Sequence, residues 1–507
     1  MDAADGRCGH RDDPRGDRLR YRAAVARAWY HHDRNQGLAM NHLSTRPDWV
    51  QDAVFYQIFP DRFANGDPSN DPPGVEPWGA PPTAHNFFGG DLAGIQQRLT
   101  YLAELGVTAL YLTPIFAAGT NHRYDTHDYL TIDPALGDTD LLRKLVAHAH
   151  DLGMRIVLDG VFNHCGDGFW AFQDVMQHGS DSPYRDWFIV RRFPIRQSPP
   201  SYQTCGGAPY LPKLNVAHPD VRQYLLHAVR YWIETADIDG WRLDVPWKVA
   251  PDFWQDVRET VKVVKPDAYL VGECWRDARP WLALFDGVMN YRLRDILLDF
   301  CVRDHMDAED AAYETQRLLA DYGPSVPYLL NLLGSHDTPR LLSLSQGDRR
   351  RAIVALTALF TYPGAPMLYY GDEIGMEGAN DPDCRRCMRW DPTEWHMDIF
   401  QACQTLIALR RAHPALRRGT WEPLVIFNGL LAYRRQCPGD DVIVILNPRD
   451  AQPDMVLDLP SGEDRRWRNR LSGSVYRATH GRLCLGHIPA TTAMILTPDE
   501  NIYAHDQ

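Results

Sequence analysis

Eight short runs of apolar, often β-branched residues alternate with amphipathic stretches through most of the chain. The expected strands cover residues 54–59, 109–113, 155–160, 240–245, 268–273, 287–290, 328–333 and 366–370. The expected helices between them include residues 92–105, 139–152, 221–236 and 252–264. Strands that alternate with helices form parallel sheets, and eight such units close into a barrel. The pattern therefore predicts an α/β fold, a (β/α)8 TIM barrel.

The barrel sequence is interrupted once. We assign its first part to residues 49–162 and its second part to residues 217–414. Residues 163–216 are too numerous, and too rich in aromatics, Gly and Pro, to form only a connecting helix. We expect this insertion, which follows the third strand, to be a small subdomain over the mouth of the barrel.

The two ends of the chain differ from the barrel. Residues 1–48 are rich in Arg, Asp and Gly with little apolar patterning, so we expect a disordered tail. Met40 is an alternative start, in which case the preceding residues are not translated. Over 415–507 the chain has five short alternating apolar runs separated by turn residues, at 424–427, 431–434, 441–446, 455–459 and 492–496. They predict a small C-terminal antiparallel β-sandwich.

Composition excludes several classes of protein. The formal net charge of -13 argues against a nucleic-acid-binding surface. No apolar run is long enough to span a membrane, and no signal peptide follows Met1. The ten cysteines show no disulfide-framework spacing, so a cytoplasmic location is expected. Cys384 and Cys387 form a single C-x-x-C, which alone is weak evidence for zinc.

Polar residues gather where the expected strands end. In TIM barrels the chemistry lies at the carboxyl ends of the strands. The third strand runs into DGVFNH with His164, and the fourth ends in GWRLDV with Arg242 and Asp244. The fifth ends in VGECW with Glu273, and the seventh runs into GSHD with His336 and Asp337. One such carboxylate could be a helix cap or an ion-pair partner, but three at strand ends of one barrel predict an active site.

These residue types suit the cleavage of an acetal with retention of configuration. That reaction needs a carboxylate nucleophile on one face of the sugar and a protonated carboxyl group that donates to the leaving oxygen. Arg242, two residues before Asp244 on the same strand face, is expected to hold the pKa of that nucleophile down. The acid must keep its proton near neutral pH, which burial and the neighbouring Asp244 and Asp337 can arrange for Glu273.

The segments DGVFNH, GWRLDV, GECW and LLGSHD resemble the four motif blocks of the α-amylase family of glycoside hydrolases. The resemblance runs from about Trp49 to the C terminus and implies an α-glucan substrate. It makes Asp244 the nucleophile, Glu273 the acid/base and Asp337 the stabiliser of the transition state. It also implies that Arg242 orients the nucleophile, and that the sugar whose bond is cut is bound by His164, His336 and the stacking ring of Tyr124.

Further segments resemble the cyclomaltodextrinase, neopullulanase and maltogenic amylase branch of the family. They are LPKLN at 211–215, GANDPDCRRCMRWD at 378–391, and FANGDPSNDP at 63–72 with FFGGDL at 87–92. The last pair offers closely spaced oxygen ligands that suit Ca²⁺. Asn65, Asp67, Asn70 and Asp71 are candidates by residue type, and the resemblance adds the Gly89 carbonyl and Asp91. The alternative is an Asx-rich turn without a metal.

Two features depart from that branch. Its members usually carry an N-terminal β-domain that shapes the dimer, and this sequence leaves no room for one, so the oligomeric state stays open. Val245-Pro246-Trp247-Lys248 follows the nucleophile where the branch has Val-Ala-Asn-Glu. Trp247 and Lys248 face the leaving-group side, where we expect them to bind an acceptor sugar and promote transglycosylation. The alternative for Trp247 is a core position beneath the next helix.

Three functions compete on this evidence. The leading one is hydrolysis of α-1,4-glucosidic bonds in maltooligosaccharides, cyclodextrins, pullulan or starch. A glucanotransferase, or a sucrose- or trehalose-converting enzyme, would use the same three carboxylates. A non-catalytic carbohydrate-binding or interaction subunit is disfavoured, because such a subunit would be expected to lack one carboxylate and to carry a membrane span.

Overall fold

The computed structural model describes residues 46–427, 429–459 and 464–499. The tail expected over residues 1–48, and with it the alternative start at Met40, lies almost entirely outside this range. Within the described residues no helix is both long and apolar enough to cross a membrane.

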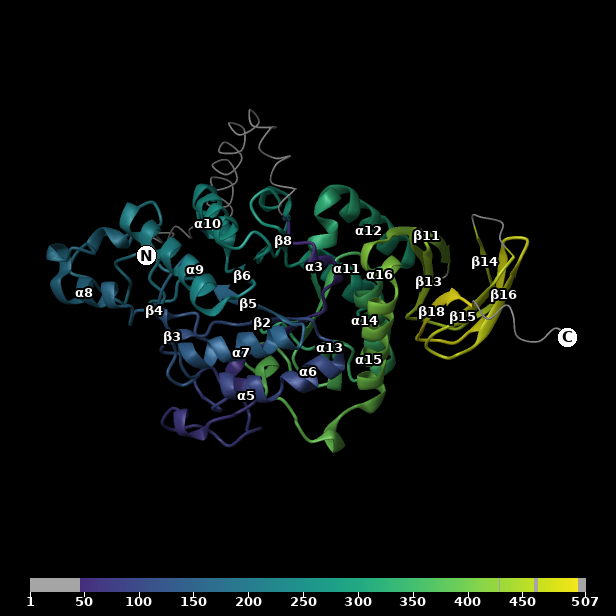
Figure 1. Ribbon diagram of the computed structural model, residues 1–507, viewed down its shortest axis with the longest axis horizontal. Helices are drawn as coiled ribbons and strands as arrows, with labels where there is room; N and C mark the ends of the chain where they lie inside the picture. The colour runs from purple at the N-terminus through teal and green to yellow at the C-terminus, as the bar shows by residue number, and fades with distance from the viewer. Residues whose placement is uncertain (1–45, 428, 460–463, 500–507) are drawn as a thin grey trace, which may run out of the picture. The chain divides into compact units, whose positions relative to one another are not determined.

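Eight parallel strands form a barrel in the described part of the chain (Figure 1). They are β1 (Phe55–Ile58), β2 (Ala109–Leu112), β5 (Arg155–Gly160), β6 (Gly240–Leu243), β7 (Tyr269–Gly272), β8 (Gly287–Val288), β9 (Leu330–Leu332) and β10 (Ala365–Tyr369). Their hydrogen-bonded order is β8-β7-β6-β5-β2-β1-β10-β9, and a parallel bridge between Met289 and Leu330 joins the two ends. The expected barrel, with all eight of its strands, is confirmed.

The inside of the barrel changes from apolar to polar along the strands. Phe55, Val157, Tyr269, Val271 and Met367 belong to one buried apolar cluster. Successive side chains on a strand point to opposite faces, so the residue two positions further on also points inward. For this reason the apolar layer is followed, at the carboxyl ends of the strands, by a layer that contains most of the polar residues described below.

Helices surround the strands and bury their apolar sides against them (Figure 1). They are α5 (Leu92–Gln97), α6 (Leu99–Leu105), α7 (Thr139–Asp151), α9 (Pro219–Ala236), α10 (Pro251–Val264), α11 (Tyr291–Cys301), α12 (Ala308–Tyr322), α14 (Arg349–Thr361) and α15 (Met397–Ala412). Aspartates cap several of them, since their carboxylates accept backbone N–H groups that have no partner within the helix. Asp91 caps α5 in this way and Asp138 caps α7.

Two long connections between barrel elements lie at the carboxyl ends of the strands. The hairpin of β3 (Phe116–Ala118) and β4 (Thr126–Ile132) follows β2. The expected insertion follows β5 and contains α8 (Trp170–His178) with irregular chain closed by short bridges. One bridge pairs His164 with Lys213, and the Lys213 ammonium donates to the Lys248 carbonyl at 2.6 Å. The insertion is therefore attached beside the ends of β5 and β6.

The C-terminal domain is an antiparallel sheet of eight strands among the described residues. They are β11 (Thr420–Phe427), β12 (Leu430–Cys437), β13 (Asp440–Asn447), β14 (Gln452–Asp458), β15 (Arg466–Asn469), β16 (Val475–Thr479), β17 (Arg482–Ile488) and β18 (Thr492–Pro498). The sheet encloses its own core, which includes Leu430, Ile443, Leu457 and Trp467. The sequence predicts five of these strands and misses β15, β16 and β17.

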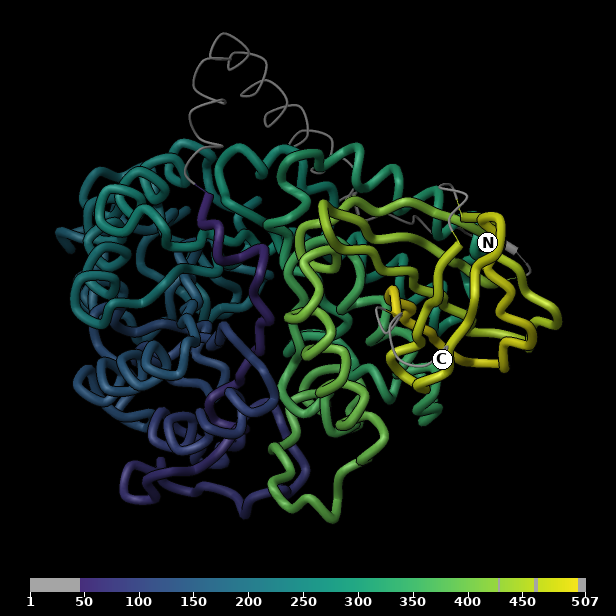
Figure 2. Tube along the Cα trace, turned by 45° about the vertical axis from the view of Figure 1, so that its right-hand side comes forward, coloured from purple at the N-terminus to yellow at the C-terminus, as the bar shows by residue number. Residues whose placement is uncertain are grey.

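Two buried arginines join this domain to the barrel. Arg410, on α15, donates to the carbonyls of Phe360, Leu416, Gln51 and Gly364. Arg435, on β12, donates to the carbonyls of Thr361, Leu416, Gly419 and Thr420. Figure 2 shows the C-terminal strands beside the green helices that carry several of these carbonyls. Each guanidinium is held by main-chain oxygens from both sides of the boundary.

Candidate active site

The polar layer brings four carboxylates to one end of the barrel. Asp159 lies on β5, and Asp244 follows β6 by one residue. Glu273 follows β7 in the same way, while Asp337 lies in the loop after β9. Asp159 is paired in register with Arg242, and both are buried. The shared face of neighbouring strands therefore explains why these side chains meet.

The Arg242 guanidinium is the centre of the arrangement. Its Nη1 lies 3.0 Å from Asp159 Oδ1 and 2.8 Å from Asp244 Oδ1, and its Nη2 lies 3.1 Å from Glu273 Oε2. The Arg242 side chain has no solvent exposure. Charge-assisted hydrogen bonds to a planar guanidinium fix both distance and orientation. Arg242 thus donates hydrogen bonds to Asp159 and Asp244 and forms an ion pair with Glu273, so the three carboxylates meet around one cation.

Two further groups hold Glu273. The Val245 backbone N–H donates to Glu273 Oε2 at 3.0 Å, and the Trp275 indole N–H donates to Oε1 at 2.6 Å. Val245 is left-handed, with φ of 36°, although it is β-branched and precedes Pro246. That conformation is strained for such a residue. The turn after Asp244 therefore directs a backbone donor at the neighbouring carboxylate.

Asp337 is held from the opposite side. Its Oδ1 accepts from Arg385 Nη2 at 3.1 Å, and its Oδ2 lies 3.1 Å from His336 Nε2. The Tyr124 ring stacks on the His336 ring at 5.4 Å with an interplanar angle of 6°. The Tyr124 hydroxyl also donates to Asp159 at 2.8 Å. Tyr124, His336 and Asp337 consequently form one contact group with the Arg242 cluster.

His164 is buried beside the same cluster. Its Nδ1 lies 3.1 Å from the side-chain amide of Asn163, which in turn accepts from Lys213 Nζ at 3.0 Å. His164 Nε2 has no hydrogen-bond partner within the described residues. A buried ring nitrogen without a partner is suited to bond a ligand hydroxyl.

The electrostatics differ from expectation at the proposed nucleophile. The sequence suggests that Arg242 holds the pKa of Asp244 down, but burial raises the pKa of Asp244 well above its ordinary value. The Arg242 charge acts in the expected downward direction, whereas the Glu273 and Asp159 charges act upward. Three carboxylates around one guanidinium carry excess negative charge, and such a group tends to retain a proton.

The residues proposed to bind calcium form a connected cluster, with one exception. Asn65 donates to Asp71 at 2.8 Å, and Asn70 donates to Asp91 at 3.0 Å. The Asp67 carboxylate instead accepts from Ser69. Gly89 lies against the cluster with φ of 77°, and a Cβ there would meet Asp71 Oδ1 at 2.2 Å.

The fit of this cluster to a cation can be judged from its oxygens. Asn65 Oδ1 and Asn70 Oδ1 are buried and have no hydrogen-bond partner in the described residues. Unpaired buried oxygens beside carboxylates are the donors that Ca²⁺ uses. Burial and the neighbouring Asp91, Asp61 and Asp67 raise the pKa of Asp71, which a cation would reverse. The donor set therefore fits calcium.

Trp247 and Lys248 lie on a short 3-10 helix, Pro246–Lys248, directly after the cluster. Trp247 is half-buried and Lys248 is exposed. Trp254, on α10, is instead fully buried, and its indole donates to the Pro246 carbonyl at 3.0 Å. The core alternative for Trp247 is therefore not what the structure shows.

Two residues of the site were not among those predicted. Arg385, which binds Asp337, lies inside the segment 378–391 that carries the resemblance, but nothing in the sequence assigns it to that partner. Trp275 lies two positions after Glu273 and beyond the end of β7, so strand alternation does not assign it to this partner. In the C-x-x-C pair, Cys384 Sγ donates to the His336 carbonyl at 3.3 Å.

Comparison with known proteins identifies the family. The model of the α-amylase catalytic domain matches residues 57–397, which is more than half of the chain. The chain belongs to the α-amylase family of glycoside hydrolases. It is an enzyme of that family, and the matched region contains the whole Arg242 cluster together with Asp337 and Arg385.

Individual relatives agree with this placement. The chain is 46% identical to a cyclomaltodextrinase from Geobacillus thermopakistaniensis over 88% of this chain and 77% of that protein. It is 45% identical to neopullulanase 2 from Thermoactinomyces vulgaris over 87% and 77% of the two chains. A solved cyclic α-maltosyl-(1→6)-maltose hydrolase from Arthrobacter globiformis is 42% identical, with a TM-score of 0.82, and the match covers 89% of this chain and 99% of that one.

The buried histidine makes the stability of this enzyme depend on pH. Burial lowers the pKa of His164 from 6.5 to about 3. Between these values the unfolded chain binds a proton that the folded chain does not, so the free energy of unfolding falls as the pH falls. His164→Asn should make this slope shallower, by at most about 1.4 kcal/mol per pH unit. Urea unfolding between pH 4 and 7 measures the slope.

The control is His487→Asn, because His487 is exposed on β17 and makes no ion pair within the described residues, so its loss should leave the slope unchanged. An identical pH dependence in His164→Asn and the unmodified enzyme would contradict the prediction.

Proposed function

We propose that this enzyme hydrolyses α-1,4-glucosidic bonds with retention of anomeric configuration. The observation that carries the proposal is that one buried guanidinium holds Asp244 and Glu273 together while Asp337 approaches the same cluster from β9. Two adjacent carboxyl groups are the requirement for a double-displacement reaction at an acetal.

The roles follow from the contacts. Asp244 attacks the anomeric carbon, while the protonated Glu273 gives its proton to the departing glycosidic oxygen. Water then attacks the glycosyl-enzyme, and Glu273 takes the proton back, so the Asp244 carboxylate is released. The first step requires the proton of this carboxyl cluster to lie on Glu273 and Asp244 to be ionised. Asp337, fixed by Arg385, can bind sugar hydroxyls as the ring is distorted.

Hydroxyl groups of the sugar that is cleaved have partners in the same cluster. His164 offers an unpaired Nε2, and His336 and Tyr124 form a stacked pair beside Asp337. We infer that Tyr124 stacks on the apolar face of this sugar, while the two histidines donate to its hydroxyls. Both histidines are neutral at physiological pH because burial lowers the pKa of each.

The substrate class is supported by the relatives, whose names include a cyclomaltodextrinase, a neopullulanase and a cyclic maltosyl-maltose hydrolase. We therefore propose maltooligosaccharides, cyclodextrins, pullulan and starch as substrates. A glucanotransferase, or a sucrose- or trehalose-converting enzyme, would use the same carboxylates. Chromatography of the products from each of these sugars, with and without an added acceptor, distinguishes the alternatives.

We also infer a cytoplasmic location. It is supported by nine cysteines in the described residues that are all free thiols, most of them buried. Thiol titration of freshly isolated enzyme tests it, because an oxidised protein from another compartment would yield fewer thiols under denaturing conditions.

Asp244→Asn and Glu273→Gln should each lower kcat/KM on maltotriose by more than about a thousandfold, because each removes a reacting group. Both variants keep the shape of the side chain, so melting temperature should change little. Asp140→Asn, at an exposed position on α7, is the control and should retain full activity.

The stereochemistry is a second readout of the same prediction. The α-anomer should be the first product detected by NMR, and a crystal structure should show the two carboxyl groups about 5–5.5 Å apart. A β-anomer, or a separation near the inverting range, would contradict the mechanism.

We propose that Asn65, Asn70, Asp71, Asp91 and the Gly89 carbonyl hold a structural Ca²⁺, with Asp67 at the edge of the site. A bound cation stabilises the folded state, by about 2.7 kcal/mol at a hundred times its Kd. EDTA should therefore lower the melting temperature, and added Ca²⁺ should restore it. Asp71→Ala should melt at the same temperature with and without EDTA, whereas the exposed-site control Asp151→Ala should respond like the unmodified enzyme. If EDTA has no effect on the unmodified enzyme, calcium is not bound.

We propose that Trp247 stacks on an acceptor sugar and that Lys248 donates to its hydroxyls. A stacked acceptor competes with water for the glycosyl-enzyme, which gives transglycosylation. Trp247→Ala should lower the ratio of transfer to hydrolysis more than it lowers total turnover. Lys248→Met separates hydrogen bonding from stacking and should have a smaller effect. An unchanged ratio in Trp247→Ala would mean that other residues build the acceptor site.

A further inference from the structure

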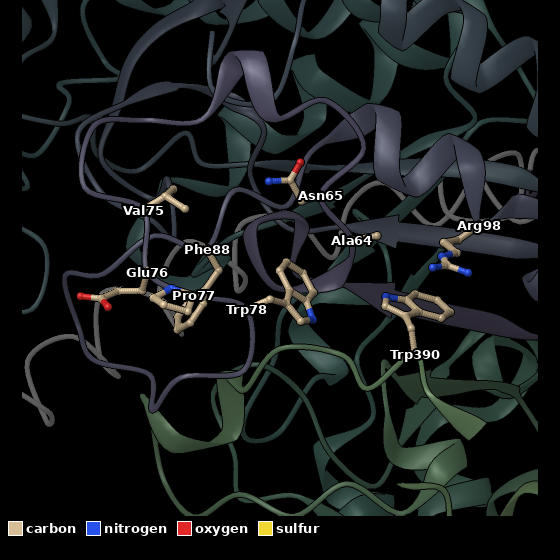
Figure 3. Close-up of a pocket in the computed structure, with 9 residues that line it drawn as sticks. All are labelled: Ala64, Asn65, Val75, Glu76, Pro77, Trp78, Phe88, Arg98 and Trp390. Atoms are coloured by element: carbon tan, nitrogen blue, oxygen red, sulfur yellow. The ribbon is translucent and has the colours of Figure 1, made fainter. Parts of the chain in front are cut away.

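A pocket of about 520 Å³ opens beside the loop that follows β1 (Figure 3). Its lining residues are Ala64, Asn65, Val75, Glu76, Pro77, Trp78, Phe88, Arg98 and Trp390. None of these belongs to the carboxylate cluster around Arg242. The volume falls within the range of small-molecule sites, about 300–1,000 Å³.

Two tryptophans form walls of this pocket, and both are fixed. The Trp78 indole donates to the Met388 carbonyl at 3.0 Å, yet the residue stays 38% exposed. The Trp390 indole donates to the Phe63 carbonyl at 2.7 Å, and its ring packs edge-on against Phe63. In Figure 3 the two indoles stand next to each other, although they come from loops far apart in the chain. Because both indoles are already fixed, a ligand that packs on them costs little side-chain conformational entropy.

The polar groups of the pocket are not satisfied by the protein. The Arg98 guanidinium lies 4.0 Å above the Trp390 ring and is half-buried. Within the described residues no hydrogen bond or ion pair of the guanidinium is observed. Glu76 is exposed at the rim, and its carboxylate likewise makes no such contact there. The pocket therefore combines an aromatic face with one cationic and one anionic hydrogen-bonding group.

These groups select for a neutral ligand that has hydroxyls and an apolar face. Glu76 and Arg98 carry opposite charges, so the two lining charges together favour neither an anion nor a cation. A purely apolar ligand would cover the guanidinium without giving it a hydrogen bond, which is costly. A sugar meets all three conditions, because its C–H face packs on an indole while its hydroxyls bond to charged groups.

We propose that this pocket is a second carbohydrate site, which binds an α-glucan chain apart from the carboxylate cluster. Trp78 stacks on a glucosyl ring, and Arg98 bonds to its hydroxyls. The choice of an α-glucan rests on the proposed function. Met388 and Trp390 follow Arg385, which holds Asp337, on the same stretch of chain. A long glucan held in the pocket is therefore kept near the cleft, and its effective concentration there rises.

The test compares a long substrate with a short one. Trp78→Ala should raise KM for soluble starch about three- to tenfold, the range expected for loss of one aromatic contact. Its kcat on starch and its kcat/KM on maltotriose should stay unchanged, because a trisaccharide gains nothing from a second site. Arg98→Gln should also raise KM for starch. Trp78→Phe keeps an aromatic ring, so it should retain most of the affinity for starch. Tyr313→Ala, at a residue 61% exposed on α12, is the matched control.

The outcomes separate failure of the second carbohydrate site from failure of the proposed function. An unchanged KM for starch in both Trp78→Ala and Arg98→Gln overturns the second site, and so does an equal loss on starch and maltotriose. If Trp78→Ala does not fold, Trp78→Phe and Arg98→Gln carry the decision. If the unmodified enzyme cleaves neither substrate, the proposed function fails. Native gels with and without starch then test the pocket alone. Equal retardation by starch in the unmodified enzyme and in Arg98→Gln overturns it.

Discussion

A single guanidinium organises the active end of this barrel. Arg242 is fully buried and lies within 3.1 Å of oxygens from three carboxylates on neighbouring strands. Removing Arg242 would leave three buried carboxylates without a counter-charge, which is far more costly than the ion pairs are stabilising. The carboxylates and the arginine therefore constrain each other, and the groups required for bond cleavage are held in place before any substrate arrives.

The barrel makes this arrangement available because its strands are in fixed register. Inward positions alternate along each strand, so Val157 is followed by Asp159 and Val271 by Glu273. The apolar layer of inward side chains forms a packed core. The layer at the carboxyl ends of the strands can hold polar side chains, because the loops there supply hydrogen-bond partners. Val245 shows the cost of the arrangement, since a strained backbone is tolerated where its N–H meets Glu273.

Much of this could be predicted from residue order alone. The eight strands and the residues at their ends follow from a period of two and from the alternation of strands with helices. Strands β15 to β17 were missed because they are short or carry arginines on exposed positions, as in RWRN at Arg466–Asn469. The upward shift in the pKa of Asp244 could not be predicted, because it depends on how deeply three charges are buried together.

Contacts between residues of different loops could not be predicted from the sequence either. The Arg385 side chain reaches Asp337 across 48 positions, and Asp67 donates its backbone N–H to Asp91 while its carboxylate accepts from Ser69. Each depends on a local turn that composition does not specify. The sequence indicates the segment in which such a residue lies, but its contact partner is known only from the folded structure.

The buried arginines at the base of the C-terminal domain have a consequence for how this enzyme can change during evolution. Arg435 belongs to that domain, yet its guanidinium donates to the Thr361 carbonyl at the end of α14. Arg410 belongs to the barrel and donates to the Leu416 carbonyl beyond it. Deleting the domain would strip a buried carbonyl of its donor on the barrel side and leave Arg410 short of a partner. Loss of the sandwich would therefore break buried hydrogen bonds inside the barrel, whereas its surface loops could be exchanged without touching them.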